Sequence, residues 1–147
     1  MKLVRYISLV FVCCFFGNAK AQSYVMDAYN LYQAQSYEEA SVKIDSAILT
    51  DAALESQTWQ LRGLIYKSID ETNTENIDTA VASFVKAKSL DETQSEKIDN
   101  FIKNTLFAYY NKSVWFMDDL QLDASVKEYN KYKAKYIEVL DSKKDFK

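Results

Sequence analysis

The sequence contains no proline, no histidine and only two glycines, and its two cysteines are adjacent, at Cys13 and Cys14. With so few turn-forming residues, a many-stranded sheet is unfavourable. The absence of histidine removes the commonest general base and the usual zinc ligand. Gly17 and Gly63 are too far apart to build a glycine-rich phosphate loop. These absences favour an all-α chain that is not an enzyme and needs no cofactor or metal.

The residues that are abundant point the same way. Alanine, leucine, lysine, glutamate and glutamine are common, and all of them favour helices. Aromatic residues make up 14% of the chain, with eleven tyrosines, which is enough to fill a helical core. The length of 147 residues suits a single domain.

The first 21 residues have the features of a signal peptide. Lys2 and Arg5 precede a short apolar run at residues 7–16, and residues 19–21 (Ala-Lys-Ala) have the small residues that signal peptidase requires. We expect cleavage before Gln22 and export to the periplasm or the exterior. A permanent anchor is the lesser alternative, because the run is short for a bilayer. Both cysteines lie inside this run, so the mature chain is expected to contain no disulfide.

Removal of this leader leaves 15 basic and 21 acidic residues, a net charge of −6. An acidic domain is repelled by a phosphate backbone, which argues against a nucleic-acid partner. The one lysine-rich segment, residues 127–135, alternates lysine with tyrosine and glutamate on a predicted helix. That pattern indicates a solvated helix face.

A pattern of large and small residues recurs three times, and the second copy is interrupted by a polar insertion at residues 70–75. The copies comprise Tyr24, Ala28, Leu31, Tyr37, Ala40, Ile44 and Ala47; then Trp59, Gly63, Tyr66, Ile77, Ala80, Phe84 and Ala87; then Tyr109, Ser113, Phe116, Leu122, Ser125, Tyr129 and Tyr132. Small residues at helical spacing let neighbouring helices approach closely, as expected at Gly63 and Ala80. The large residues are expected to form one continuous core: Leu31, Ile44, Tyr66, Phe84, Phe116 and Tyr129.

The pattern resembles the tetratricopeptide repeat (TPR) family. The resemblance rests on Trp59-x-x-Arg62-Gly63-x-x-Tyr66, on residues 37–40 (Tyr-Glu-Glu-Ala), and on Ala80-x-x-x-Phe84-x-x-Ala87. It implies a short right-handed solenoid of about three repeats, in which six helices form stacked antiparallel pairs. The family's terminal proline is missing, and Ala52 and Glu92 stand in its place.

This register predicts helices at 22–35, 37–50, 54–70, 74–90, 94–119 and 122–142. The TPR domain is expected over 22–143, with repeats at about 21–54, 56–94 and 106–139 and a tail at 144–147. Residues 95–105 look like an N-terminal extension of the fifth helix, which should be the longest.

Carboxylate pairs offer little chemistry. Glu38 and Glu39 are adjacent on a helix, as are Asp118 and Asp119, so each pair diverges by about 100° instead of converging on one bond. Asp118, Asp119 and Asp123 also cluster around a turn. The EF-hand spacing and its glycine are absent, so a polar turn is favoured over a calcium site.

In the resembled family, the first helix of each pair lines a concave face that contacts peptides or partner proteins. Transferred to this sequence, that role falls on twelve residues, whose tyrosines are equally well explained as fillers between repeats. These residues are Val25, Tyr29, Tyr32, Gln33, Gln57, Gln60, Leu64, Lys67, Tyr110, Val114, Met117 and Asp118.

Three function hypotheses follow. The first is a non-catalytic module in the cell envelope that binds a peptide or partner protein. The second is a shortened part of a larger TPR protein whose activity lies in further C-terminal sequence. Exposed apolar surface on the sixth helix would support it, although Lys127, Glu128, Lys131 and Lys135 give that helix a polar side that can act as a cap. The third is a carboxylate-based enzyme. Self-association through the repeat ends is a further possibility.

Overall fold

The computed structural model describes residues 21–70, 72–118 and 121–140, and it describes only the backbone of Phe116 and Asp118. Most of the predicted signal peptide and the tail at 144–147 therefore lie outside the described residues. Within these residues every regular element is a helix, which confirms the all-α class.

The described part of the chain is helical from residue 21 to residue 33, and five labelled α-helices follow. They are α2 (Tyr37–Ala47), α3 (Ser56–Ile69), α4 (Thr74–Leu90), α5 (Ser95–Asp118) and α6 (Leu122–Leu140). Each matches a predicted helix to within a few residues. With 24 residues, α5 is the longest of the described helices, as predicted.

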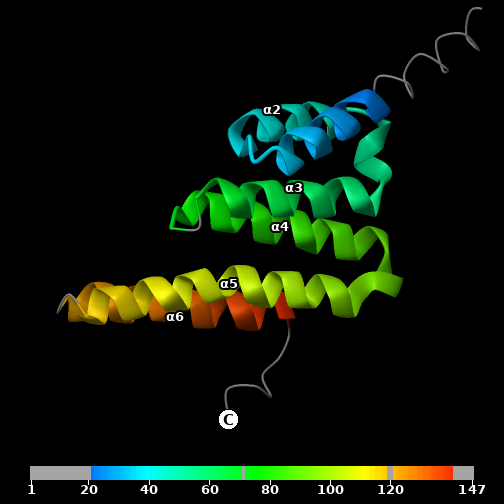
Figure 1. Ribbon diagram of the computed structural model, residues 1–147. Helices are drawn as coiled ribbons and strands as arrows, with labels where there is room; N and C mark the ends of the chain where they lie inside the picture. The colour runs from blue at the N-terminus through cyan, green and yellow to red at the C-terminus, as the bar shows by residue number, and fades with distance from the viewer. Residues whose placement is uncertain (1–20, 71, 119–120, 141–147) are drawn as a thin grey trace, which may run out of the picture.

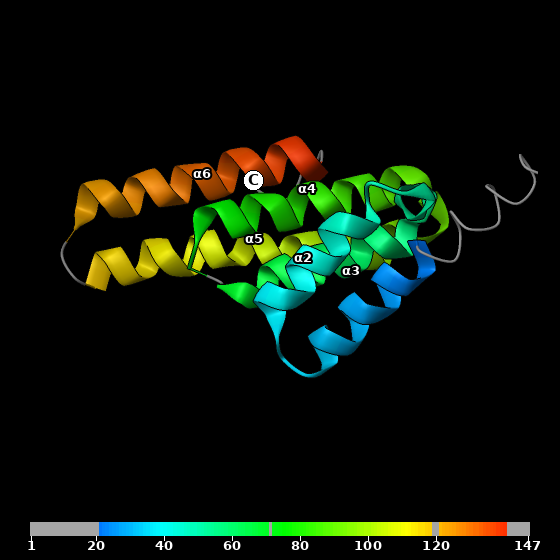
Figure 2. The same ribbon diagram turned by 90° about the horizontal axis from the view of Figure 1, so that it is seen from above.

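Consecutive helices pack against each other along the chain, with contacts from α2 to α3, α3 to α4, α4 to α5 and α5 to α6. Figure 1 shows three tiers, in which the N-terminal helix lies with α2, α3 with α4, and α5 with α6. Seen from above, the first helix of each tier lies toward one side and the second toward the other (Figure 2). The side formed by the N-terminal helix, α3 and α5 is the one expected to bind a partner.

One turn of 3-10 helix joins each tier to the next, at η1 (Asp51–Leu54) and η2 (Glu92–Gln94). The side chain of Thr50 accepts a hydrogen bond from the backbone N–H of Ala52, and Asp91 accepts one from Thr93. These side-chain caps satisfy donors that a helix start leaves without partners. They provide the break between tiers at the positions where the resembled family has proline.

The hydrophobic core consists of two clusters, so the prediction of one continuous core is wrong. The first contains Ala28, Ile44 and Ile65, and the second contains Phe84 and Ile102. Helix α3 contributes to both, because opposite faces of one helix can pack on different neighbours. Tyr129 was expected in the core but is 40% exposed, because it lies on the face of α6 that no described helix covers.

A polar network joins α2, α3 and α4. The Arg62 Nε donates to Asp45 at 2.8 Å, and its Nη1 donates to the Ser83 hydroxyl at 2.7 Å. The Tyr66 hydroxyl donates to the second carboxylate oxygen of Asp45 at 2.6 Å, and the guanidinium lies 4.6 Å from the Tyr66 ring centroid. Burial, followed by the hydrogen bond to Asp45, raises the pKa of Tyr66. The network therefore ties three helices together where the two core clusters meet.

At Gly63, where close packing of helices was predicted, the nearest side chain is the Phe84 ring. A Cβ atom at this position would lie 2.5 Å from Cε1 of Phe84, whose side chain is fully buried. Any larger residue at position 63 would therefore require the Phe84 ring to move. Ala80 is also fully buried, as expected of a small residue in the packed face of α4.

Residues 95–105 form the N-terminal part of α5, as predicted, and they pack on α4. Ile98 and Ile102 are fully buried in the second cluster, and Phe101 stacks on Phe84 with ring centroids 5.3 Å apart. The N-terminal half of α5 is thus the part that packs on α4. Lys112 is already level with the α3–α4 turn, since its ammonium group donates to the Thr72 carbonyl. The remaining turns of α5 project with α6 beyond the other tiers (Figure 1).

Candidate partner-binding surface

Of the predicted residues on the N-terminal helix, two are exposed to solvent and two pack against the core. Tyr29 and Gln33 are exposed, whereas Val25 and Tyr32 are half-buried against the first cluster. The Tyr32 ring lies 5.7 Å from that of Tyr37 on α2. On this helix one tyrosine therefore faces solvent and the other fills a gap between helices.

The predicted residues of α3 are similarly divided. Gln57 is exposed, Leu64 is half-buried against the second cluster, and Lys67 is half-buried. Gln60 is buried, and its amide donates to Ser56 and to Gln94 of η2. Lys97 at the start of α5 donates in turn to the Gln60 carbonyl oxygen at 3.3 Å. The amide of Gln60 is thus used inside the chain, where it joins α3 to the next tier.

The predicted residues of α5 all lie in its C-terminal half. The Tyr110 ring stacks on Phe107, with centroids 5.1 Å apart, and lies 6.1 Å from Tyr132 of α6. Val114 is half-buried and Met117 is exposed. The side chain of Asp118 lies outside the described residues. Tyr110 therefore belongs to the outer face of the α5–α6 hairpin.

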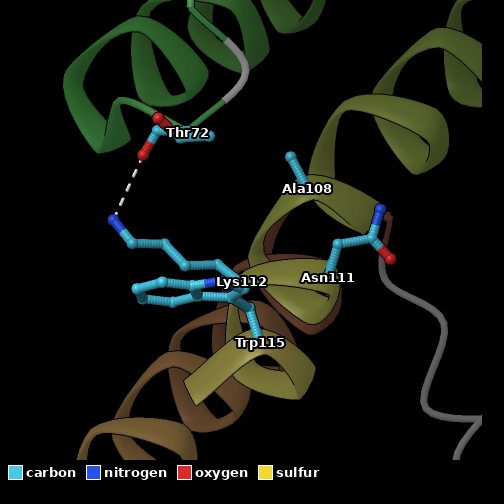
Figure 3. A pocket seen from close by; sticks show the side chains of 5 residues that line it. All are labelled: Thr72, Ala108, Asn111, Lys112 and Trp115. Carbon is cyan, nitrogen blue, oxygen red and sulfur yellow. Dashed lines mark hydrogen bonds between the residues drawn. The ribbon is translucent and has the colours of Figure 1, made fainter. Parts of the chain in front are cut away.

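A pocket of about 510 Å³ lies where the α3–α4 turn meets α5, and we call it the α5 pocket. Its lining is Thr72, Ala108, Asn111, Lys112 and Trp115. Asn111 and Lys112 are adjacent, and each is three or four positions from both Ala108 and Trp115, which puts the four α5 residues on one broad helix face. Figure 3 shows Lys112 and Trp115 extending toward one side of the helix and Asn111 toward the other, with Ala108 between them.

The chemistry of the α5 pocket is mixed. The Lys112 ammonium group donates to the Thr72 carbonyl oxygen at 3.1 Å, which leaves further donors of the same group for a ligand. Trp115 is 60% exposed and provides a large apolar surface with one donor. Asn111 is exposed and offers both a donor and an acceptor. Hydrogen bonds from Thr72, and more weakly the Lys112 charge, lower the pKa of Asp70 beside the pocket.

A second pocket, of about 700 Å³, lies between the N-terminal helix, η1 and the start of α3. Its lining includes Val25 and Gln57, so the structure brings two predicted residues from different tiers to one site. Asp51 and Glu55 line it as well and make it acidic. Both pockets are thus lined by first helices of the tiers.

The residues of the α5 pocket were missed because the third repeat was aligned from Tyr109. Trp115 gave the available signal, since a large aromatic residue there has no position in the repeat pattern. Its spacing from Ala108 and Asn111 completes a helix face. The remaining element, Thr72, comes from the insertion and could be placed only by the fold.

Polar groups are also buried between α4, α5 and α6. Glu128 is buried and accepts a hydrogen bond from Lys131 at 2.9 Å, while its Oε2 accepts none from the described residues. Burial, followed by the charge of Asp78, raises the pKa of Tyr109. Within the described ranges there is no cluster of three or more metal-ligating acids, and no helix is long and apolar enough to cross a bilayer.

Comparison with known proteins gives no relative. No family model, no curated protein and no solved structure matches the chain.

Proposed function

We propose that the protein is an exported, non-catalytic helical scaffold of the tetratricopeptide type, which binds a peptide or partner protein on the side formed by the N-terminal helix, α3 and α5. The observation that carries the proposal is the α5 pocket. Its volume lies in the range of about 300–1,000 Å³ that is usual for ligand sites. A half-open pocket with one exposed indole and a few polar groups suits an extended peptide.

The pocket residues have complementary roles in this proposal. The Asn111 amide can pair with a peptide backbone, since it presents a donor and an acceptor in one plane. Trp115 covers an apolar side chain, and tryptophan is among the residues that contribute most to interface affinity. Lys112 favours an acidic side chain or a carboxylate terminus beside that apolar group. The proposed ligand is therefore an acidic peptide segment with a bulky apolar residue.

A random-peptide display selection on the full chain tests this proposal. We expect enrichment of peptides that combine an acidic group with an aromatic or aliphatic residue. The Trp115→Ala variant should lose at least about tenfold in affinity, equivalent to roughly 1.4 kcal/mol. The matched control is Lys86→Ala, an exposed change on α4 outside the pocket. Equal binding by all three proteins would refute the proposed site.

Fluorescence gives a second readout. Trp59 and Trp115 are the two tryptophans of the sequence, so a Trp59→Phe variant reports on Trp115 alone. We expect its emission to shift to shorter wavelength as a selected peptide excludes water from the indole. A peptide that binds tightly without changing this emission occupies another surface.

The second hypothesis, part of a larger protein, has one supporting observation. Leu122, Val126 and Tyr129 expose apolar surface along α6. Of the polar residues expected to cap this helix, Lys135 pairs with Asp78 of α4 at 3.6 Å, and Lys131 donates to Glu128 on the same helix at 2.9 Å. The carboxylate-enzyme hypothesis ranks third.

A further inference from the structure

The outer face of the α5–α6 hairpin is largely apolar, with one lysine on each helix. On α5 it consists of a stripe with helical spacing, Lys103, Phe107, Tyr110 and Val114, of which the first three are exposed. On α6 the matching stripe is Leu122, Val126, Tyr129 and Lys133, all exposed. Ring contacts of Tyr132 with Tyr110 and Tyr129, at 6.1 and 6.2 Å, join the two stripes. We call this surface the C-terminal face.

At the opposite end of the molecule (Figure 1) two apolar side chains are exposed, one on α2 and one just beyond it. Val42 is 65% exposed, and Leu49 just beyond the helix is 86% exposed. Glu38 and Glu39 flank them at the start of the same helix and are also exposed. Val42 lies about 200° around α2 from the buried Ala40, so it points away from the packed side of this helix. We call the surface formed by these exposed residues the N-terminal face.

The two faces differ in charge. The N-terminal face carries the exposed carboxylates of Glu38 and Glu39, and the one lysine of α2, Lys43, pairs with Asp27 at 3.6 Å. Lys103 and Lys133 stand within the apolar stripes of the C-terminal face. An acidic apolar face and a basic apolar face on opposite ends of one molecule are complementary to each other.

From this complementarity we propose that the occupant of the C-terminal face is the N-terminal face of a second copy of the chain. The contact is heterologous, because two different surfaces meet, and each added copy leaves one face of each kind open. The tiers would then continue from one molecule to the next. The inference is independent of the proposed peptide site, since Trp115 and Asn111 lie outside both faces.

Charge reversal tests the pairing. In sedimentation velocity on the full chain at low salt, we expect mass to increase with concentration without stopping at a dimer. Lys103→Glu with Lys133→Glu should weaken association at least about tenfold, because like charges then meet. Glu38→Lys with Glu39→Lys should weaken it similarly. The matched control, Lys86→Glu with Glu75→Lys, reverses exposed charges of the middle tier and should leave association unchanged.

Mixing the two reversed proteins provides the decisive measurement. Each associates poorly alone, but an acidic C-terminal face can bind a basic N-terminal face, so an equimolar mixture should regain association. A wild-type protein that stays monomeric at all concentrations overturns the proposal, as does a mixture that fails to recover. A closed dimer sensitive only to Lys103 and Lys133 overturns it as well, because it requires two C-terminal faces to meet. Circular dichroism confirms that each variant is folded.

Discussion

Helix α3 and the α5–α6 hairpin use similar residues in opposite situations. In α3, Arg62 and Tyr66 are committed to Asp45 and to each other, and the helix has core on two sides. In the hairpin, Phe107, Tyr110 and Lys103 are exposed on a face that no described helix covers. The difference comes from position in the stack, because only an inner helix has neighbours on both sides. Aromatic and basic residues thus stabilise the centre and are available for binding at the end.

The largest expected contrast lies between two phenylalanines. Phe84 is fully buried, so Phe84→Ala should lower the free energy of unfolding by about 3–5 kcal/mol. Phe107 is 49% exposed, and Phe107→Ala should change it by only about 0.5 kcal/mol. Urea denaturation followed by circular dichroism measures both. Similar losses for the two variants would mean that the hairpin face is covered and that the contrast is wrong.

Gly63→Ala should destabilise the protein by about 1–3 kcal/mol through overpacking. Alanine is the better helix former by about 1 kcal/mol. The new methyl group would collide with the buried Phe84 ring, and this collision outweighs the gain, so the free energy of unfolding falls. Phe84→Leu in the same chain should recover part of the loss. An increase in stability on Gly63→Ala would show that the ring has room to move.

Asp45→Ala should cost about 1–2 kcal/mol, because it leaves Arg62 and Tyr66 without their shared acceptor. The cost is limited because the Asp45 side chain is 41% exposed and water can replace it. Asp27→Ala removes the looser pair with Lys43 and serves as the control, with an expected change near zero. Equal effects in thermal denaturation would show that the network does not couple α2 to α3 and α4.

The smallest expected effect is a pH dependence. Burial raises the pKa values of Tyr66, Tyr109 and Tyr132 above their ordinary value of 10.0, so the folded state holds these protons more tightly than the unfolded state. Their contribution to stability is complete below about pH 10 and is lost as the pH rises through the folded values. Tyr109→Phe should make the alkaline decline in urea midpoint shallower. An unchanged slope would mean that Tyr109 ionises as freely as in the unfolded chain.

The sequence was sufficient for the helices and for close packing at Gly63, because spacing and side-chain size are local properties, but it did not identify the Phe84 ring as the neighbour of Gly63. It was insufficient for the register of α5. Ile98, Ile102 and Tyr109 continue one hydrophobic spacing without a break, so nothing local marks which half packs on α4. The burial of Gln60 was also missed, since its partner Gln94 is supplied by η2. Contacts between tiers depend on the linkers, which the repeat pattern does not describe.

The capped 3-10 turns between tiers have a consequence for recognition. The side chains of Thr50 and Asp91 cap the two linkers and fix their conformation. Neighbouring tiers are therefore held at a set spacing and are not joined by flexible chain. The distance between the two pockets is then fixed. Under the proposed function, a ligand that contacts both pockets would have to match their separation, so these two short turns would set a selectivity for ligand length.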